Sequence, residues 1–138
     1  MTSTANTYDP YRHAAELGIR IVEAQPPAGT LALWDEQTRT ILTAPGLLWR
    51  QRRCVIAHEL AHAISGDEHT LLDDVASIKR ERRADTIAAG WLLQPQAVKT
   101  ALAVAPDSLS AAAAELEVTE RILSAWLWEH SKRGGLDS

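Results

Sequence analysis

The stretch C-V-I-A-H-E-L-A-H-A-I-S-G-D-E-H, residues 54–69, contains the pattern His-Glu-x-x-His at His58, Glu59 and His62. Its apolar residues predict a long helix that ends at Gly66, because glycine commonly follows the last helical turn. Residues four apart share one face of a helix and lie about 6 Å apart along its axis. His58 and His62 can therefore direct their imidazole nitrogens at one metal ion.

The residue types of this pattern favour zinc. Two imidazole nitrogens and one carboxylate oxygen leave a fourth position of Zn²⁺ open for water, whose pKa then falls to about 7. Glu59 lies about 100° further round the helix, beside that open position, where it can take a proton from the water. We therefore expect one zinc ion per chain, with Glu59 as the catalytic base. The alternative is a chance arrangement of solvated side chains, which the apolar neighbours Val55, Ile56, Leu60, Ala61 and Ile64 disfavour.

The pattern does not by itself decide the third ligand. The candidates that follow it are Asp67, Glu68, His69, Asp73, Asp74 and Glu81. Asp67 and Glu68 follow the end of the helix so closely that the chain would have to fold straight back to reach the ion. Asp73 and Asp74 fit a loop that ends in the N-cap of the next helix better.

His69 invites comparison with the pattern His-Glu-x-x-His-x-x-Gly-x-x-His. In this chain the glycine and the histidine each come one residue too late for that pattern, so the match fails. A histidine in a loop near a cleft can still donate a hydrogen bond to the oxyanion of a tetrahedral intermediate. We keep His69 as a candidate for that contact, beside the alternative of an ordinary surface histidine.

Glu81 is the preferred third ligand. It lies 19 residues after His62, inside a helix predicted over residues 74–93, which leaves enough chain for a turn and an antiparallel return. Asp85 follows four residues later on the same face, where it can accept the second N–H of a ligating histidine and fix its tautomer. The alternative for Glu81 is a solvated helix face within K-R-E-R-R-A-D, residues 79–85.

The remaining pattern predicts an α+β fold. Residues 19–24 alternate apolar and polar side chains, as a strand does, and two prolines at 26–27 end it. Residues 30–35 and 38–43 fit a β-hairpin, and the alanine-rich residues 96–132 fit two or three helical pieces. We expect a small antiparallel sheet of about three strands, packed against a helical bundle that carries the His-Glu-x-x-His helix.

Length and composition predict one domain over residues 1–138, with a core at about 19–95 and a helical extension at about 96–132. A net charge of -4 argues against general binding of nucleic acid. The single cysteine and the absence of a long apolar run predict a cytoplasmic protein without a membrane span. The oligomeric state stays open.

Three segments occur together in a characteristic order. They are G-T-L-A-L-W-D-E-Q-T-R-T-I-L-T-A-P at 29–45, R-R-C-V-I-A-H-E-L-A-H-A-I at 52–64 and E-R-R-A-D-T-I-A-A-G-W-L-L-Q-P at 81–95. In this order they resemble the ImmA/IrrE family of small metallopeptidases, and the similarity covers roughly residues 19–95. The chain departs from the family at Ile87, where phenylalanine is usual, and at Gln94, where methionine is common.

The resemblance implies zinc ligands at His58, His62 and Glu81, a catalytic base at Glu59, and a supporting carboxylate at Asp85. It further implies a zinc-dependent endopeptidase that cleaves an intracellular regulatory protein, such as a helix-turn-helix repressor of a phage or another mobile element. A second hypothesis is an anti-repressor or transcription-associated regulator that acts by binding, with a structural or idle metal site.

Direct binding to DNA is not expected. Residues 108–130 have the spacing of a helix-turn-helix unit, but the second helix offers only Arg121 as a base-reading side chain. Its apolar Ile122, Trp126 and Leu127 suit packing against protein better. A basic cluster near the metal-bearing helices could attract an acidic substrate, although most such charges are merely solvated; it comprises Arg50, Arg52, Arg53, Lys79, Arg80, Arg82 and Arg83.

Overall fold

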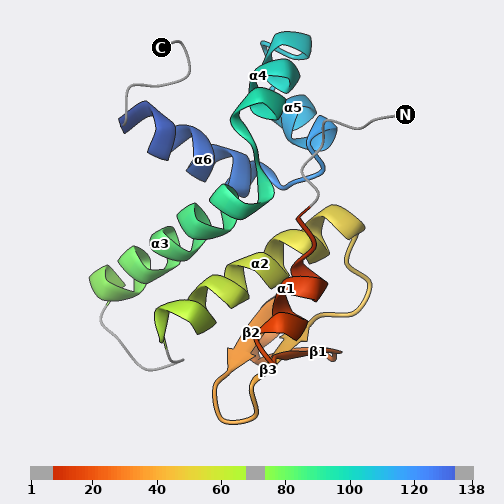
Figure 1. The fold of residues 1–138 in the computed structure, drawn as a ribbon, viewed down its shortest axis with the longest axis vertical. Helices are drawn as coiled ribbons and strands as arrows, with labels where there is room; N and C mark the ends of the chain where they lie inside the picture. Colours follow the sequence, from red (N-terminus) through yellow and green to blue (C-terminus); the bar gives the residue numbers. More distant parts are fainter. Residues whose placement is uncertain (1–7, 68–73, 133–138) are drawn as a thin grey trace.

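The computed structural model of the protein describes residues 8–67 and 74–132. Three short strands, β1 (Arg20–Glu23), β2 (Ala32–Asp35) and β3 (Thr40–Thr43), form a sheet in the order β1-β3-β2. Helices occupy most of the remaining chain and pack on one side of this sheet (Figure 1). The α+β class predicted from the sequence is therefore confirmed.

The sheet is mixed, so the expectation of a purely antiparallel sheet is wrong for one strand pair. β2 and β3 form the predicted antiparallel hairpin, whereas β1 pairs with β3 in parallel. After β1 the chain passes through Pro26 and the short 3₁₀ turn η1 (Pro27–Gly29). It then forms β2 two strand positions away, which leaves one position open beside β1. The hairpin then places β3 in the gap, and β3 runs in the same direction as β1.

The described part of the chain contains six α-helices: α1 (Pro10–Glu16), α2 (Trp49–Ser65), α3 (Asp74–Leu92), α4 (Pro95–Val104), α5 (Leu109–Glu115) and α6 (Glu120–Lys132). Figure 1 shows α2 and α3 side by side, with α2 next to the sheet and α6 crossing α3 on its other side. Within residues 8–67 and 74–132, no helix has both the length and the apolar character that a membrane span requires.

Helix α2 lies between two apolar cores. On the sheet side, Ile56 and Leu60 are fully buried against a cluster that also contains Ala14, Ile19, Trp34 and Ile41. On the other side, Cys54 and Ala57 join a larger cluster built by the helices from α3 to α6, with Leu92, Val98, Leu123 and Trp126 among its members. Packing on both sides fixes α2, and the remaining strip of its surface carries the histidines.

Candidate metal centre

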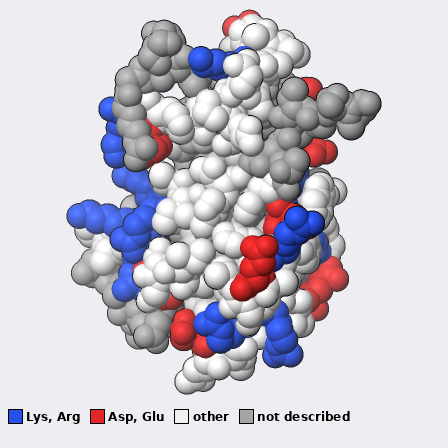
Figure 2. Space-filling view, in the orientation of Figure 1, with Lys and Arg blue, Asp and Glu red and all other residues white. Residues whose placement is uncertain are grey.

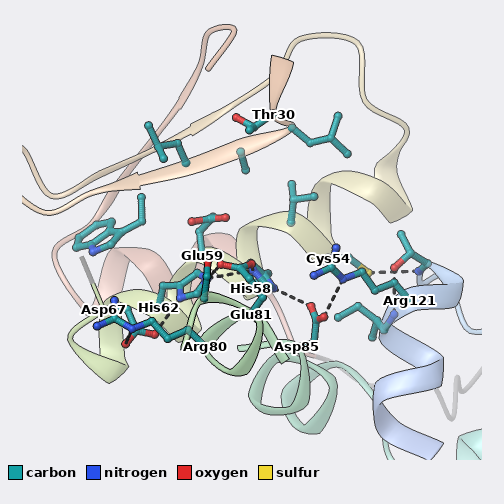
Figure 3. A pocket seen from close by; sticks show the side chains of 18 residues that line it. Thr30, Cys54, His58, Glu59, His62, Asp67, Arg80, Glu81, Asp85 and Arg121 are labelled. Atoms are coloured by element: carbon teal, nitrogen blue, oxygen red, sulfur yellow. Dashed lines mark hydrogen bonds and ion pairs between the residues drawn. The ribbon is translucent and has the colours of Figure 1, made fainter. Parts of the chain in front are cut away.

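His58 and His62 lie one turn apart on α2, and Glu81 faces them from α3 (Figure 3). The Nε2 atoms of the two histidines are 3.1 Å apart. Glu81, on the neighbouring helix α3, contacts both rings: its Oε1 lies 2.8 Å from Nε2 of His58, and its Oε2 lies 3.1 Å from Nε2 of His62. The structure thus brings together the three side chains that the sequence suggested as metal ligands.

These distances fit a metal ion. Tetrahedral zinc holds nitrogen and oxygen ligands at about 2.0–2.1 Å, which places the ligand atoms about 3.3 Å from one another. The observed separations of 2.8–3.1 Å need only small side-chain movements to reach that value. Two histidines and one glutamate are also a donor set of catalytic zinc sites, which keep a fourth position open. His58, His62 and Glu81 could therefore hold a metal ion.

The protonation pattern of the two rings supports this interpretation. Nδ1 of His58 lies 2.8 Å from Oδ1 of Asp85, and Nδ1 of His62 lies 3.0 Å from Oδ2 of Asp67. A carboxylate only accepts, so each Nδ1 must donate, and in a neutral ring each Nε2 then carries a lone pair. Two lone pairs that face each other and the carboxylate of Glu81 require a proton or a cation between them.

The electrostatics of the cluster favour positive charge. Burial lowers the pKa of His58, but hydrogen bonds to Asp85 and Glu81 outweigh burial and raise this pKa to about 9. The pKa of His62 is raised in the same way, by Glu81 and Asp67 against burial. Hydrogen bonds from both rings hold the pKa of Glu81 well below its usual range. The site therefore attracts protons, or a metal cation in their place.

Glu59 lies beside the cluster and belongs to a different part of the site. Its side chain points away from the three converging side chains, toward the sheet (Figure 3). Burial raises the pKa of its carboxyl group, and the nearby charges of His58 and His62 oppose that rise. A desolvated carboxylate that lies near a metal site but is not placed to coordinate the metal is suited to proton transfer.

A cavity of about 590 Å³ opens over the cluster, between β2, α2, α3 and the start of α6. Among the described residues only β3 pairs with β2, so β2 is an edge strand of the sheet. The backbone N–H of Ala44 donates to the carbonyl oxygen of Leu31, so the backbone groups of Leu31 and of every second residue after it point toward β3. The backbone groups of Ala32 and Trp34 consequently point away from β3, toward the cavity.

Asp85 and Arg121 form a connected pair behind His58. Asp85 uses one oxygen for His58, as the sequence suggested, and its Oδ2 accepts a 2.7 Å hydrogen bond from Nε of Arg121 on α6. Arg121 was noted in the sequence only as a possible base-reading residue. It instead ties the C-terminal helices to the metal site.

Sequence reasoning missed the role of Asp67. It was weighed only as a direct ligand and set aside, because the chain would have to fold straight back to reach the ion. The chain does fold back, and Asp67 reaches Nδ1 of His62. The signal that could have revealed this is Gly66, whose left-handed backbone (φ 76°) reverses the chain at the end of α2. Glu68, His69 and Asp73 lie outside the described residues.

Cys54 lines the cavity but does not belong to the metal cluster. Its Sγ accepts a hydrogen bond from the backbone N–H of Thr119 at 3.4 Å, and the residue is 3% exposed. Burial raises the pKa of the thiol. The side chain is therefore a buried packing group.

The predicted basic cluster divides into separate parts. Arg53 is buried and donates to the carbonyl oxygen of Glu117, while Arg52 pairs with Glu23 at 2.8 Å. The basic residues of α3 are mostly exposed, and Figure 2 shows basic side chains along the edge formed by α3 and α6. No continuous basic rim forms around the cavity from the seven residues.

A His-Glu-x-x-His helix, a glutamate from the next helix and an edge strand beside the site define a metallopeptidase-type domain. The chain belongs to the peptidase family M78, the IrrE N-terminal-like domain, whose model matches residues 14–126. This match confirms the resemblance to the ImmA/IrrE family and extends it through most of the C-terminal helices. No curated protein and no solved structure gives a significant match to the chain.

Proposed function

We propose that the protein is a zinc-dependent endopeptidase. One observation carries the proposal: the atoms of His58, His62 and Glu81 converge at one point, and the carboxylate of Glu59 lies beside that point without joining it. A purely structural zinc site is usually closed by four protein ligands. Among the described residues, the cluster supplies three, which is the number found in hydrolytic sites.

Glu59 would move the proton in this reaction. When bound, zinc supplies a Lewis acid that makes water acidic enough to be deprotonated near neutral pH. Glu59 takes one proton from the attacking water as the water oxygen bonds to the peptide carbonyl carbon. It then gives that proton to the amide nitrogen, and the carbon–nitrogen bond breaks.

The edge of β2 would hold the substrate. Backbone groups of Ala32 and Trp34 that point into the cavity can pair with an extended peptide, as an added strand would. Strand addition engages the middle of a chain as well as its end, which favours an endopeptidase. Main-chain pairing does not depend on the side chains of the substrate. Specificity would therefore come from the apolar side chains that line the cavity, among them Leu33, Val55 and Ile122.

The substrate we propose is an intracellular regulatory protein, such as a helix-turn-helix repressor of a phage or another mobile element. Membership of the IrrE N-terminal-like family supports this choice. The alternative remains an anti-repressor that acts by binding, without cleavage. The two hypotheses differ in whether Glu59 is needed.

The test is Glu59→Gln, which preserves size and hydrogen bonding but cannot take up a proton. We expect turnover of a mixed peptide library, followed by mass spectrometry, to fall about 10²–10⁴-fold while zinc content is unchanged. Glu115→Gln is the matched control, since Glu115 is exposed on α5 and does not line the cavity. Equal cleavage by Glu59→Gln and wild type would refute the mechanism.

A further inference from the structure

The end of α2 is built to reverse the chain sharply. Gly66 adopts a left-handed conformation, its N–H donates to the carbonyl oxygen of Ala63 at 3.3 Å, and the N–H of Asp67 donates to that of His62 at 3.0 Å. These two bonds form a Schellman motif, which satisfies the last carbonyls of a helix. The residue after the glycine is thereby returned to the side of the helix that it has just left.

The Asp67 side chain lies against His62 in a buried position. The residue is 7% exposed, and its Oδ2 is 3.0 Å from Nδ1 of His62. The other oxygen, Oδ1, accepts a 3.1 Å hydrogen bond from Nη2 of Arg83 on α3, and Nε of Arg80 lies 3.8 Å away. Both carboxylate oxygens are therefore engaged, and the arginines compensate the buried charge.

The same arrangement occurs at the other histidine. Asp85 contacts Nδ1 of His58 with one oxygen and Arg121 with the other, at 2.8 Å and 2.7 Å (Figure 3). Each histidine thus has its own carboxylate, and each carboxylate is held by an arginine of a different helix. A single pair of this kind is compatible with a charged surface. Two pairs at adjacent ligands, both with buried carboxylates, indicate a shared role at the metal site.

We propose that Asp67 is a positioning residue for the metal site, which orients His62 as Asp85 orients His58. This inference rests on the proposed metal-binding function. By accepting the Nδ1–H, Asp67 fixes the tautomer with the Nε2 lone pair directed at Glu81, and its negative charge makes the ring a better ligand. Arg83 anchors the carboxylate, so the end of α2 and the middle of α3 are locked in the register that the cluster needs.

The test compares wild type, Asp67→Ala and Asp67→Asn by zinc affinity, measured by competition with a chelator. We expect a 10- to 100-fold weaker affinity for Asp67→Ala, the usual effect of removing such a partner. Asp67→Asn should lose less, because its amide oxygen can still accept the Nδ1–H bond. If Asp67→Ala does not fold, the zinc affinity of Asp67→Asn relative to wild type tests the proposal in its place.

NMR of the zinc-loaded proteins separates positioning from a merely structural role. The Nδ1–H of His62 should give a downfield, slowly exchanging signal in wild type that shifts upfield or disappears in Asp67→Ala. The signal of His58, which contacts Asp85, should not move and serves as an internal control. A folded Asp67→Ala with wild-type affinity and an unchanged His62 signal would overturn the inference alone. A wild-type protein that binds no zinc would overturn the proposed function together with it.

Discussion

Gly66→Ala tests the reversal at the end of α2. The left-handed region costs a residue with a Cβ about 1–2 kcal/mol. A Cβ at Gly66 would meet no atom within 4 Å, so no steric cost is added. Alanine also lowers the conformational entropy of the unfolded chain, which stabilises the folded state by about 0.4–1 kcal/mol. We therefore expect the free energy of unfolding to fall by about 1 kcal/mol, and Tm by about 3–5 °C in a chain of this length.

The assay is thermal and urea unfolding of the metal-free protein, since bound zinc would stabilise the folded state on its own. Gly90→Ala is the matched control. Gly90 lies within α3 and also has empty space at its Cβ, but its backbone does not have a positive φ. Alanine there should stabilise the protein by about 0.5–1 kcal/mol. If Gly66→Ala stabilised the protein as much as Gly90→Ala does, the left-handed turn would be refuted, and with it the reason for the position of Asp67.

Glu81→Ala should bind zinc much more weakly than wild type in elemental analysis by mass spectrometry; full occupancy in the mutant would show that the third ligand lies elsewhere. Arg53→Met should lower the free energy of unfolding by about 1.5–3 kcal/mol, because a buried charged hydrogen bond to the carbonyl oxygen of Glu117 is lost. A change under about 0.5 kcal/mol in urea unfolding would contradict this assignment. Zinc affinity should rise from pH 7 to pH 9. Burial lowers the pKa of His58 in the metal-free protein, but its hydrogen bonds raise that pKa to about 9, so zinc must displace a proton below this pH. Calorimetry in buffers of different ionisation enthalpy measures how many protons are released when zinc binds. A zinc affinity that does not vary with pH would exclude this proton release.

Local features of the chain were well predicted from the sequence. The helix that carries His58 and His62 ends at Ser65, directly before Gly66, as predicted. The predicted hairpin forms, and the alanine-rich C-terminal residues form three helices, α4, α5 and α6, within the predicted two or three pieces. These features depend on turn residues, caps and periodicity, which act between near neighbours in the chain.

Features that depend on distant partners could not be predicted in the same way. The alternation of residues 19–24 indicates a strand but not its neighbour, so the parallel pairing of β1 with β3 was missed. The pairing of Arg121 with Asp85 joins residues 36 positions apart, and it exists only because α6 crosses α3. Glu81 was found because a motif and a loop length both indicated it. Asp67 was missed because the reversal at Gly66 was not taken into account.

The position of α2 between two cores bears on how the protein unfolds. Cys54 and Ala57 belong to one core, Ile56 and Leu60 to the other, and Trp91 packs against both. Neither core can open without exposing one side of the same helix, so we expect their unfolding to be a single cooperative event. Backbone amides of α2 should then show the slowest hydrogen exchange in the chain. The two histidines would be separated from each other only when the whole structure is lost, which ties release of the metal by this route to global unfolding.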